Sequence, residues 1–286
     1  MGRLRRYFLI YFETFSVPTA DTLFLLILSI LALESAHSIR FLYQHFLSGI
    51  TEKSLNVFYY ACSYAKVDYS RFMNTTVRIA LKLITDSLQM QPVFLCVDDT
   101  MVSKFGTKFE NVSKLFDHAA HNGSNYLNGH CFVSVMLCVP VWNGDKVSYL
   151  SIPLGYRMWQ KKKSKLELAV SMIRQVMPEF HSKDHVIILC DSWYTKQNLV
   201  SIVDEYPNLD LICSARIDSV MYDLAPARTG DRSSGTSCQT WKTSVCSRSC
   251  NSRYKYTILT DTLCSFLHLF IINHTERMIF EIVRFG

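Results

Sequence analysis

Five short apolar segments between residues 93 and 215 constrain the fold of this chain more than any other feature of the sequence. Each is bounded by polar or turn-forming residues and has the length of a buried strand rather than that of a helix. The dipeptide Asn143-Gly144, between the second and third segments, predicts a tight hairpin. The five predicted strands are Val93–Val97, Cys131–Val139, Lys146–Leu154, His185–Cys190 and Leu209–Ala215.

Two helical segments separate the later strands. Lys163–Met177 has apolar residues at helical spacing and ends at Pro178, and Thr195–Tyr206 ends before Pro207. Strands joined by a hairpin are antiparallel, whereas a helical crossover returns the chain to a parallel neighbour. We therefore predict an α/β fold with a mixed sheet flanked by helices, in the strand order of an RNase H-like core.

Residues 1–90 are predicted to be a helical N-terminal region with segments Thr19–Tyr43, Glu52–Tyr64 and Tyr69–Leu88. Short helices joined by a glycine-containing turn are compatible with a DNA-binding helix-turn-helix and equally with a plain helical bundle. The apolar run Leu23–Leu33 is shorter than the roughly 20 residues that span a bilayer. We therefore expect a buried helix there and no membrane partner.

The net charge of +6 is unevenly distributed along the chain. Lys and Arg outnumber Asp and Glu nine to six in residues 1–90 and seven to four in residues 231–286, with fourteen of each between. Basic flanks around a neutral middle favour a polyanionic partner such as DNA.

Cysteine and histidine spacing argues against a zinc site. Most of the ten cysteines lie inside apolar runs, as buried thiols do in a reducing cytosol. No Cys-x2-Cys pair occurs, and the spacing of His118, His121 and His130 fits no standard zinc pattern.

Two aspartates end the first and fourth predicted strands. Asp98 follows the first and Asp191 the fourth, so both would project from one edge if these strands are neighbours. Two such carboxylates can share Mg²⁺, and a pair of ions can activate water against a phosphodiester. Alternation along the strand sends Asp98 and Asp99 to opposite faces, so one of them faces the metal, and we favour Asp98.

Residues 98–140, which begin Asp98-Asp99-Thr100, and residues 186–200, which contain Cys190-Asp191-Ser192, resemble the DDE domain of insertion-sequence transposases. The resemblance covers about half of the chain, roughly residues 92–230. It implies cleavage of double-stranded DNA at transposon ends and joining of the 3′-hydroxyl to a target, with two Mg²⁺ ions, or Mn²⁺ as a substitute. It also implies a bacterial cytoplasmic, nucleoid-associated protein that forms a homo-oligomer.

The family's third ligand is a glutamate on a later helix, in the pattern Tyr-x2-Arg-x3-Glu-x6-Lys. This chain has His274-x2-Arg277-x3-Glu281 and ends before the lysine position, so Glu281 is the candidate. We therefore expect a C-terminally truncated or frameshifted member that cleaves DNA poorly. The alternative function is that of a catalytically inactive, DNA-binding transposase remnant.

A lysine run precedes the helix of residues 163–177. Lysines at a helix start can bind DNA phosphates, although charge runs also occur on plain solvated faces. The candidate nucleic-acid contacts are Lys161, Lys162, Lys163 and Lys165.

These observations predict three parts. Residues 1–90 form the helical region, residues 91–230 form the RNase H-like DDE catalytic domain, and residues 231–286 form an irregular tail. The tail has a Ser- and Cys-rich stretch, which suggests an out-of-frame or decayed end of the gene.

Overall fold

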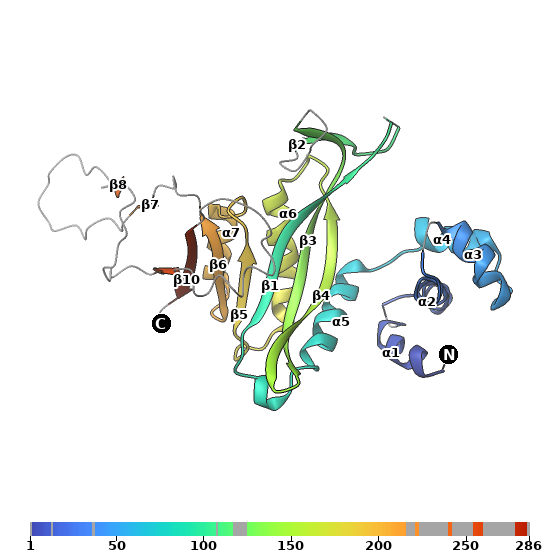
Figure 1. The fold of residues 1–286 in the computed structure, drawn as a ribbon, viewed down its shortest axis with the longest axis horizontal. Coiled ribbons are helices and arrows are strands. Elements are labelled where there is room, and N and C mark those ends of the chain that lie inside the picture. The colour runs from blue at the N-terminus through green and yellow to red at the C-terminus, as the bar shows by residue number, and fades with distance from the viewer. Residues whose placement is uncertain are drawn as a thin grey trace, which may run out of the picture. The chain divides into compact units, whose positions relative to one another are not determined.

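The computed structural model describes residues 2–12, 14–35, 38–106, 108–116, 125–215, 221–222, 240–241, 254–259 and 278–284. The chain divides into two compact units, Met1–Ile79 and Ala80–Gly286. Figure 1 shows the helices of the first unit and the sheet of the second.

The described elements of the first unit are helical. The expected segment Thr19–Tyr43 is two helices, because the chain is extended at Leu33 and a new helix starts after Ser38, whose hydroxyl caps the Phe41 N–H. No described helix is both long enough and apolar enough to cross a membrane. The helices are α1 (Gly2–Phe12), α2 (Val17–Ala32), α3 (Ile39–His45), the 3₁₀ turn η1 (Leu47–Gly49), α4 (Leu55–Ser63) and α5 (Tyr69–Leu81).

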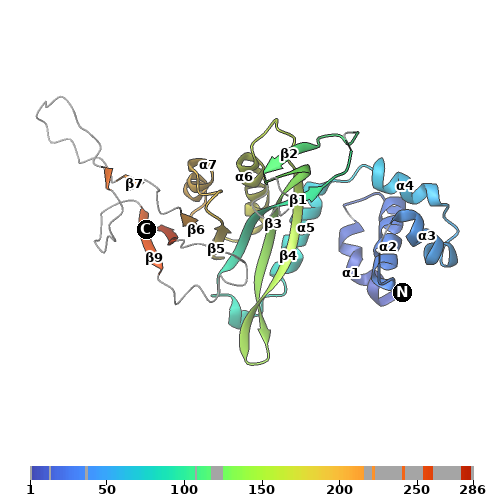
Figure 2. The same cartoon turned by 45° about the horizontal axis from the view of Figure 1, so that its top comes forward.

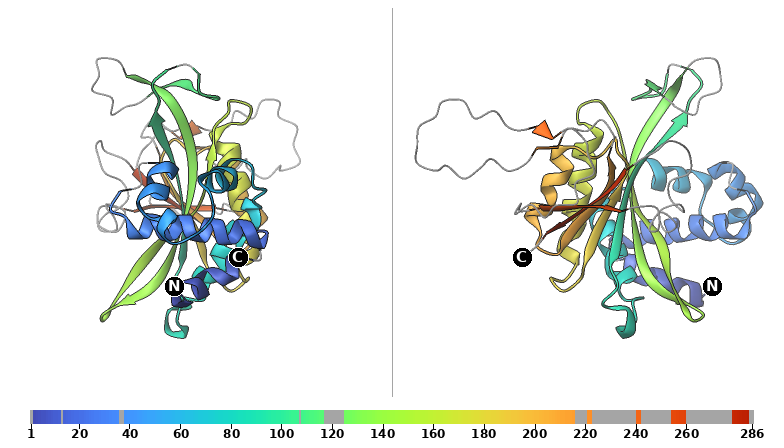
Figure 3. Two further views of the ribbon diagram at one scale, coloured as in Figure 1. Left: turned by 90° about the vertical axis from the view of Figure 1, so that its right-hand side faces the viewer. Right: turned by 60° about the vertical axis from the view of Figure 1, so that its left-hand side comes forward.

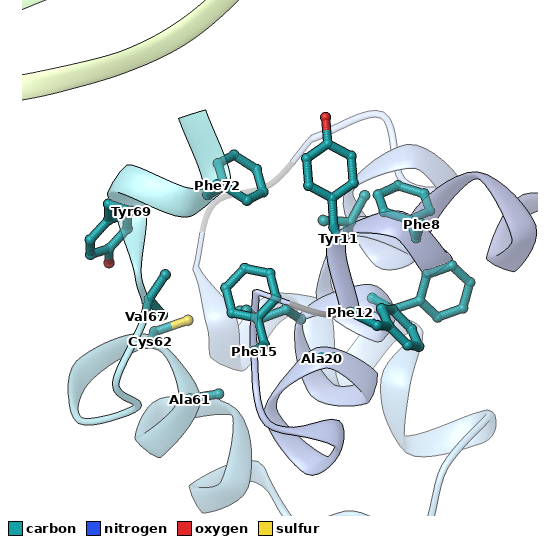
Figure 4. Close-up of a pocket in the computed structure, with 13 residues that line it drawn as sticks. Phe8, Tyr11, Phe12, Phe15, Ala20, Ala61, Cys62, Val67, Tyr69 and Phe72 are labelled. Carbon is teal, nitrogen blue, oxygen red and sulfur yellow. The ribbon is translucent and has the colours of Figure 1, made fainter. Parts of the chain in front are cut away.

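These helices enclose an apolar cavity of about 480 Å³ (Figure 4). Aromatic rings from α1, α2 and α5 line much of it. The hydroxyl of Tyr11, one of the polar groups nearby, already lies 3.1 Å from the Thr76 hydroxyl. The lining is therefore mainly apolar, with the Cys62 thiol and the Tyr69 side chain among its few polar groups. Its aromatic lining comprises Phe8, Tyr11, Phe12, Phe15, Phe24, Tyr69 and Phe72.

The second unit is built on one mixed sheet, so the protein is mixed α/β as predicted. Its strand order is β2-β3-β1-β5-β6-β10-β9, and β4 also pairs with β3, on the edge opposite β1. The strands are β1 (Val93–Ser103), β2 (Ser113–Phe116), β3 (Tyr126–Asn143), β4 (Lys146–Met158), β5 (Val186–Cys190), β6 (Leu209–Ala215), β9 (Tyr254–Leu259) and β10 (Met278–Arg284).

Strand directions follow from the connections. The hairpin-linked strands β3 and β4 are antiparallel, as are β1 and β3, whereas β1, β5 and β6 run parallel. Helix α6 (Lys165–Val176) packs against β3 and joins the hairpin to β5, and α7 (Gln197–Val200) joins β5 to β6. Figure 3 shows these helices beside the sheet.

Several strands are longer than the apolar runs that predicted them. Strand β1 continues through its polar end to Ser103, and β3 and β4 form a long hairpin, seen extending from the sheet in Figure 2. Gly144 at its turn has φ +61°, a value that favours glycine, and this confirms the predicted turn. Strand β2 lies between the first two predicted strands, where no element was predicted from the sequence.

The remaining elements are short. The 3₁₀ turns η2 (Asp86–Leu88), η3 (Met177–Glu179) and η4 (Ser201–Glu205) extend or precede regular elements, so the predicted helix Thr195–Tyr206 is α7 followed by η4. The two-residue strand β7 (Met221–Tyr222) lies near the end of the predicted catalytic domain, and in the predicted tail the described residues form β8 (Thr240–Trp241), β9 and β10. Most of its Ser- and Cys-rich stretch lies outside the described residues.

Helix α6 begins with a complete capping box. The Ser164 hydroxyl accepts from the Glu167 N–H at 3.1 Å, and the Glu167 carboxylate accepts from the Ser164 N–H at 2.6 Å. Its buried face includes Leu166, Val170 and Ile173, as the spacing predicted.

Replacing the cap should destabilise the second unit. We expect Ser164→Ala to lower the free energy of unfolding by about 1 kcal/mol, because the first turn of α6 loses a hydrogen-bond acceptor. Urea unfolding followed by circular dichroism measures the change. Ser171→Ala, which removes an exposed hydroxyl within the same helix, is the control and should cost less. Equal losses in the two variants would contradict a specific capping effect.

Candidate active site

The two aspartates predicted from the sequence lie side by side in the backbone register. Asp98 lies within β1, and Asp191 directly follows β5, the parallel neighbour of β1. Val97 is the register partner of Cys190, so Asp191 occupies the next position, beside Asp98. Adjacent strands are roughly 4.8 Å apart, so the two residues are neighbours at the point where β5 ends. Asp98 does not end its strand as predicted, because β1 continues to Ser103.

The electrostatics of Asp98 reflect this neighbour. Partial desolvation is the largest effect and raises the pKa of the Asp98 carboxyl, while the Asp99 N–H, 2.8 Å from its Oδ1, acts to lower it. The negative charges of Asp99 and Asp191 raise the pKa further, and Lys165 lowers it. Together these effects leave the pKa of the Asp98 carboxyl above its usual value. The surroundings therefore disfavour a negative charge on Asp98.

Asp191 also organises the chain after β5. Its Oδ1 accepts hydrogen bonds from the Trp193 N–H at 3.0 Å and the Tyr194 N–H at 3.4 Å, an Asx-type turn. The Thr195 hydroxyl donates to the Asp191 carbonyl at 3.3 Å. Both turn bonds to the side chain use Oδ1, so the turn does not occupy Oδ2.

Asp99 points to the opposite face from Asp98 and is half-buried. Three donors surround its carboxylate: Lys165 Nζ at 2.7 Å, the Tyr194 hydroxyl at 3.2 Å and the Cys131 thiol at 3.3 Å. They come from α6, from the chain just after β5 and from β3. Asp99 therefore ties three elements together on the core side, directly behind Asp98.

Burial shapes the titration of this network. It lowers the pKa of Lys165, but the hydrogen bond and charge of Asp99 outweigh it, so that pKa lies above its ordinary value. Burial raises the pKa of the Cys131 thiol to about 11. Burial and the charge of Asp99 also raise the pKa of Tyr194. At neutral pH the network therefore holds a lysinium, a protonated thiol and a protonated phenol around Asp99.

The structure separates the four candidate lysines. Lys161, Lys162 and Lys163 are exposed in the loop before α6, whereas Lys165 forms the ion pair with Asp99 and lies 5.1 Å from the Trp193 ring. Three of the lysines are therefore exposed to solvent, and the fourth belongs to the half-buried network around Asp99.

Glu281 lies on strand β10, opposite Ile212 of β6, and not on a helix as the family pattern would have it. His118 and His121 lie outside the described residues, and His130 Nε2 lies 2.8 Å from the Glu110 carbonyl oxygen. Within the described parts of the chain, no three His, Cys, Asp or Glu side chains are grouped to hold a metal ion.

No family model matches the chain, and a search of the curated proteins finds no similar sequence.

Sequence reasoning missed Tyr194 and Cys131. Tyr194 is among the largest fully buried side chains, and its position three residues after Asp191 was the available signal. Cys131 was expected to be only a strand residue, because nothing in its neighbourhood marks it as a donor to Asp99.

The Lys165–Asp99 pair gives the first prediction about the site. The two side chains are 18% and 16% exposed, so Lys165→Met leaves a largely buried carboxylate without its cation. We expect the free energy of unfolding to fall by roughly 2–3 kcal/mol, since Tyr194 and Cys131 still donate. Urea denaturation measures it.

Two further variants test the cause. Lys163→Met, at an exposed lysine, should change stability by about 0.5 kcal/mol or less. Adding Asp99→Asn to Lys165→Met should restore much of the lost free energy of unfolding, because the unpaired negative charge of Asp99 is then removed. A double variant no more stable than Lys165→Met alone would refute the charge argument.

The raised pKa of Asp98 predicts a pH-dependent effect. The folded state binds the Asp98 proton more tightly than the unfolded state, so ionisation destabilises the fold as pH rises through the unfolded and then the folded pKa. Asp98→Asn should therefore stabilise the protein at pH 7, by on the order of 0.5 kcal/mol after solvent screening, and not below about pH 3.5. Thermal unfolding at both pH values measures the difference. A gain that is the same at both would show that Asp98 ionisation is not the cause.

Proposed function

We propose that this protein acts on DNA as a DDE-type transposase, by metal-dependent phosphodiester cleavage and strand transfer. The observation that supports the proposal best is the juxtaposition of Asp98 and Asp191 on neighbouring parallel strands, with the pKa of Asp98 raised in part by the charge of Asp191. A divalent cation would relieve the excess negative charge that the protein leaves at this edge.

The sheet supports an RNase H-like catalytic unit. The spatial order is β4-β3-β1-β5-β6, and the directions of these strands are those predicted from the hairpin and the helical crossovers. Asp98 comes from the central strand of this set and Asp191 follows its parallel neighbour. A site at the carboxyl end of such strands is where open α/β sheets commonly place ligands.

Asp98 and the Oδ2 oxygen of Asp191 are the groups that would hold Mg²⁺. When bound, the cation supplies a Lewis acid that activates water and stabilises the leaving oxygen of a phosphodiester. Asp99, held by Lys165 and Tyr194, would position both carboxylates from behind, because it adjoins Asp98 in sequence and contacts the residue that closes the Asp191 turn.

The exposed Lys161, Lys162 and Lys163 would contact DNA phosphates from the loop before α6. Their charges lie at the start of the helix whose Lys165 reaches Asp99. Phosphate contacts and the carboxylates would therefore belong to one structural unit.

A specific observation favours the second candidate, an inactive DNA-binding remnant. Glu281, the expected third ligand, lies on strand β10 opposite Ile212 of β6 and not on a helix as in the family pattern. Two-metal catalysis needs ions about 3.5–4 Å apart on both sides of the scissile phosphate, and two carboxylates hold a second ion poorly. Weak binding of one cation with little cleavage is therefore the expected behaviour.

Metal binding tests the site directly. We expect the protein to bind Mn²⁺, measured as loss of the free-ion signal in electron paramagnetic resonance. Asp98→Asn and Asp191→Asn should each weaken binding at least about tenfold, since they remove a charged ligand. Asp145→Asn, in the exposed β3–β4 turn, is the matched control and should bind like the unmodified protein. Unchanged binding in both site variants would overturn the proposed metal site.

A cleavage assay with Mg²⁺ or Mn²⁺ on DNA that includes the flanking ends of the gene separates the two candidates. Slow nicking lost in Asp191→Asn supports residual transposase activity. Binding without nicking supports the inactive remnant. Robust nicking that Glu281→Ala abolishes would restore a full triad and contradict the expectation of poor activity.

A further inference from the structure

One face of the sheet runs from Asp98 to the far end of β2 and β3. In an antiparallel pair, directly opposed residues share a face, and so do alternate residues along each strand. Successive rows across the sheet are Asp98–Ser134–Tyr156, Thr100–Phe132–Met158, Val102–His130, Asn128–Lys114 and Tyr126–Phe116.

This face, which we call the open face, is more exposed than its reverse. The reverse side of the same strands includes the buried residues Val133, Cys131 and Leu115, together with Gly129. On the open face Asp98, Thr100 and Val102 are exposed along β1. Figure 1 shows the ends of β1 and β3 with β2 extending beyond the rest of the sheet.

Aromatic rings and a lysine occupy the open face. Tyr156 is 54% exposed, and Phe116 and Tyr126 are 44% exposed. The Phe116 and Tyr126 rings meet edge to face, with centroids 5.3 Å apart. Lys114 Nζ lies 4.5 Å from the centre of the Tyr126 ring.

A second lysine–aromatic pair lies beside the end of β1. Lys104 Nζ is 5.6 Å from the centre of the Phe109 ring, and Phe109 is 51% exposed. The described residues from Lys104 to Phe116 include three lysines and one acidic residue, Glu110. This segment therefore has a net positive charge.

We propose that the open face binds an unpaired DNA strand, with bases stacked on Tyr126, Phe116 and Tyr156 and the backbone contacted by Lys114. Exposed rings stack on any base, and neighbouring lysines attract the phosphates, which is the general chemistry of single-strand binding. The face ends at Asp98, roughly 15 Å along β1 from Ser103, so a bound strand leads to the carboxylates.

The observations favour an unpaired strand over a duplex or a protein. Paired bases do not offer their faces to rings on a sheet, and one lysine on the face itself is a small charge for duplex affinity. The rings are spread over several rows and interleaved with polar side chains, unlike a contiguous apolar protein interface. The inference rests on the proposed function only in taking DNA as the nucleic acid.

The test uses the full-length protein and a fluorescein-labelled oligothymidine of roughly 15 nucleotides, measured by anisotropy. EDTA is present throughout, so that the result does not depend on the metal site or on cleavage. An abasic oligonucleotide of the same length has the same phosphates without bases. A duplex of equal length is the third probe.

Three variants address the face. Tyr126→Leu and Phe116→Leu keep apolar volume but remove the ring, and each should weaken oligothymidine binding about tenfold while leaving abasic binding unchanged. Lys114→Met should reduce the slope of log K against log salt by about 0.7 for both single strands. Tyr7→Leu replaces a tyrosine of α1 that is 77% exposed and should have no effect.

Each outcome decides the proposal. Tighter binding of oligothymidine than of the abasic strand, lost in the ring variants, supports it. Equal binding of both single strands, or equal loss for both in the ring variants, overturns it. A loss of duplex binding in the ring variants as large as the loss of oligothymidine binding overturns it as well. No binding to any probe overturns it in favour of a protein partner. Thermal unfolding of each variant confirms that the sheet is intact.

Discussion

The alternation of side chains along β1 is the constraint on which the arrangement of the site depends. Val93, Leu95 and Val97 are buried, so the next residue on that face, Asp99, must also point toward the core. An acid there requires a cation, and Lys165 of α6 supplies it. Asp98 is turned by the same alternation to the opposite face, where none of the described residues forms an ion pair with it. Two adjacent aspartates therefore differ in role: the Asp99 carboxylate holds the structure together, and the Asp98 carboxylate is available to a ligand.

The positions of the central strands could be predicted from the sequence, because the core of each is a buried run with clear boundaries. Leu209–Ala215 is a strand with the predicted limits, and the hairpin at Asn143-Gly144 is formed by the residues that such turns require. The carboxyl-terminal half of β1 and all of β2 were missed, because strands exposed on one face mix polar and apolar residues and resemble loops. The break between α2 and α3 was missed because both helices are apolar and no glycine or proline marks the junction.

The site itself was predictable only in part. Strand ends and neighbouring strands follow from local pattern and connection rules, so Asp98 and Asp191 could be named in advance. The donors to Asp99 could not, because Lys165, Tyr194 and Cys131 reach it across 66, 95 and 32 residues of chain. Lys165 shows the difficulty well. In sequence it belongs to a basic run, and only the packing of α6 distinguishes it from the exposed lysines just before it.

Gly129 of β3 pairs with Ser103 of β1 and with Ser113 of β2, and a Cβ atom there would come within 2.3 Å of the Val102 carbonyl oxygen. Any other residue would force β1 and β3 apart at that row while leaving the buried rows nearer Asp98 in place. The outer rings and the carboxylates therefore keep a fixed spacing only as long as position 129 has no side chain. A glycine at position 129 therefore fixes how far the Phe116 and Tyr126 rings lie from Asp98 and Asp191.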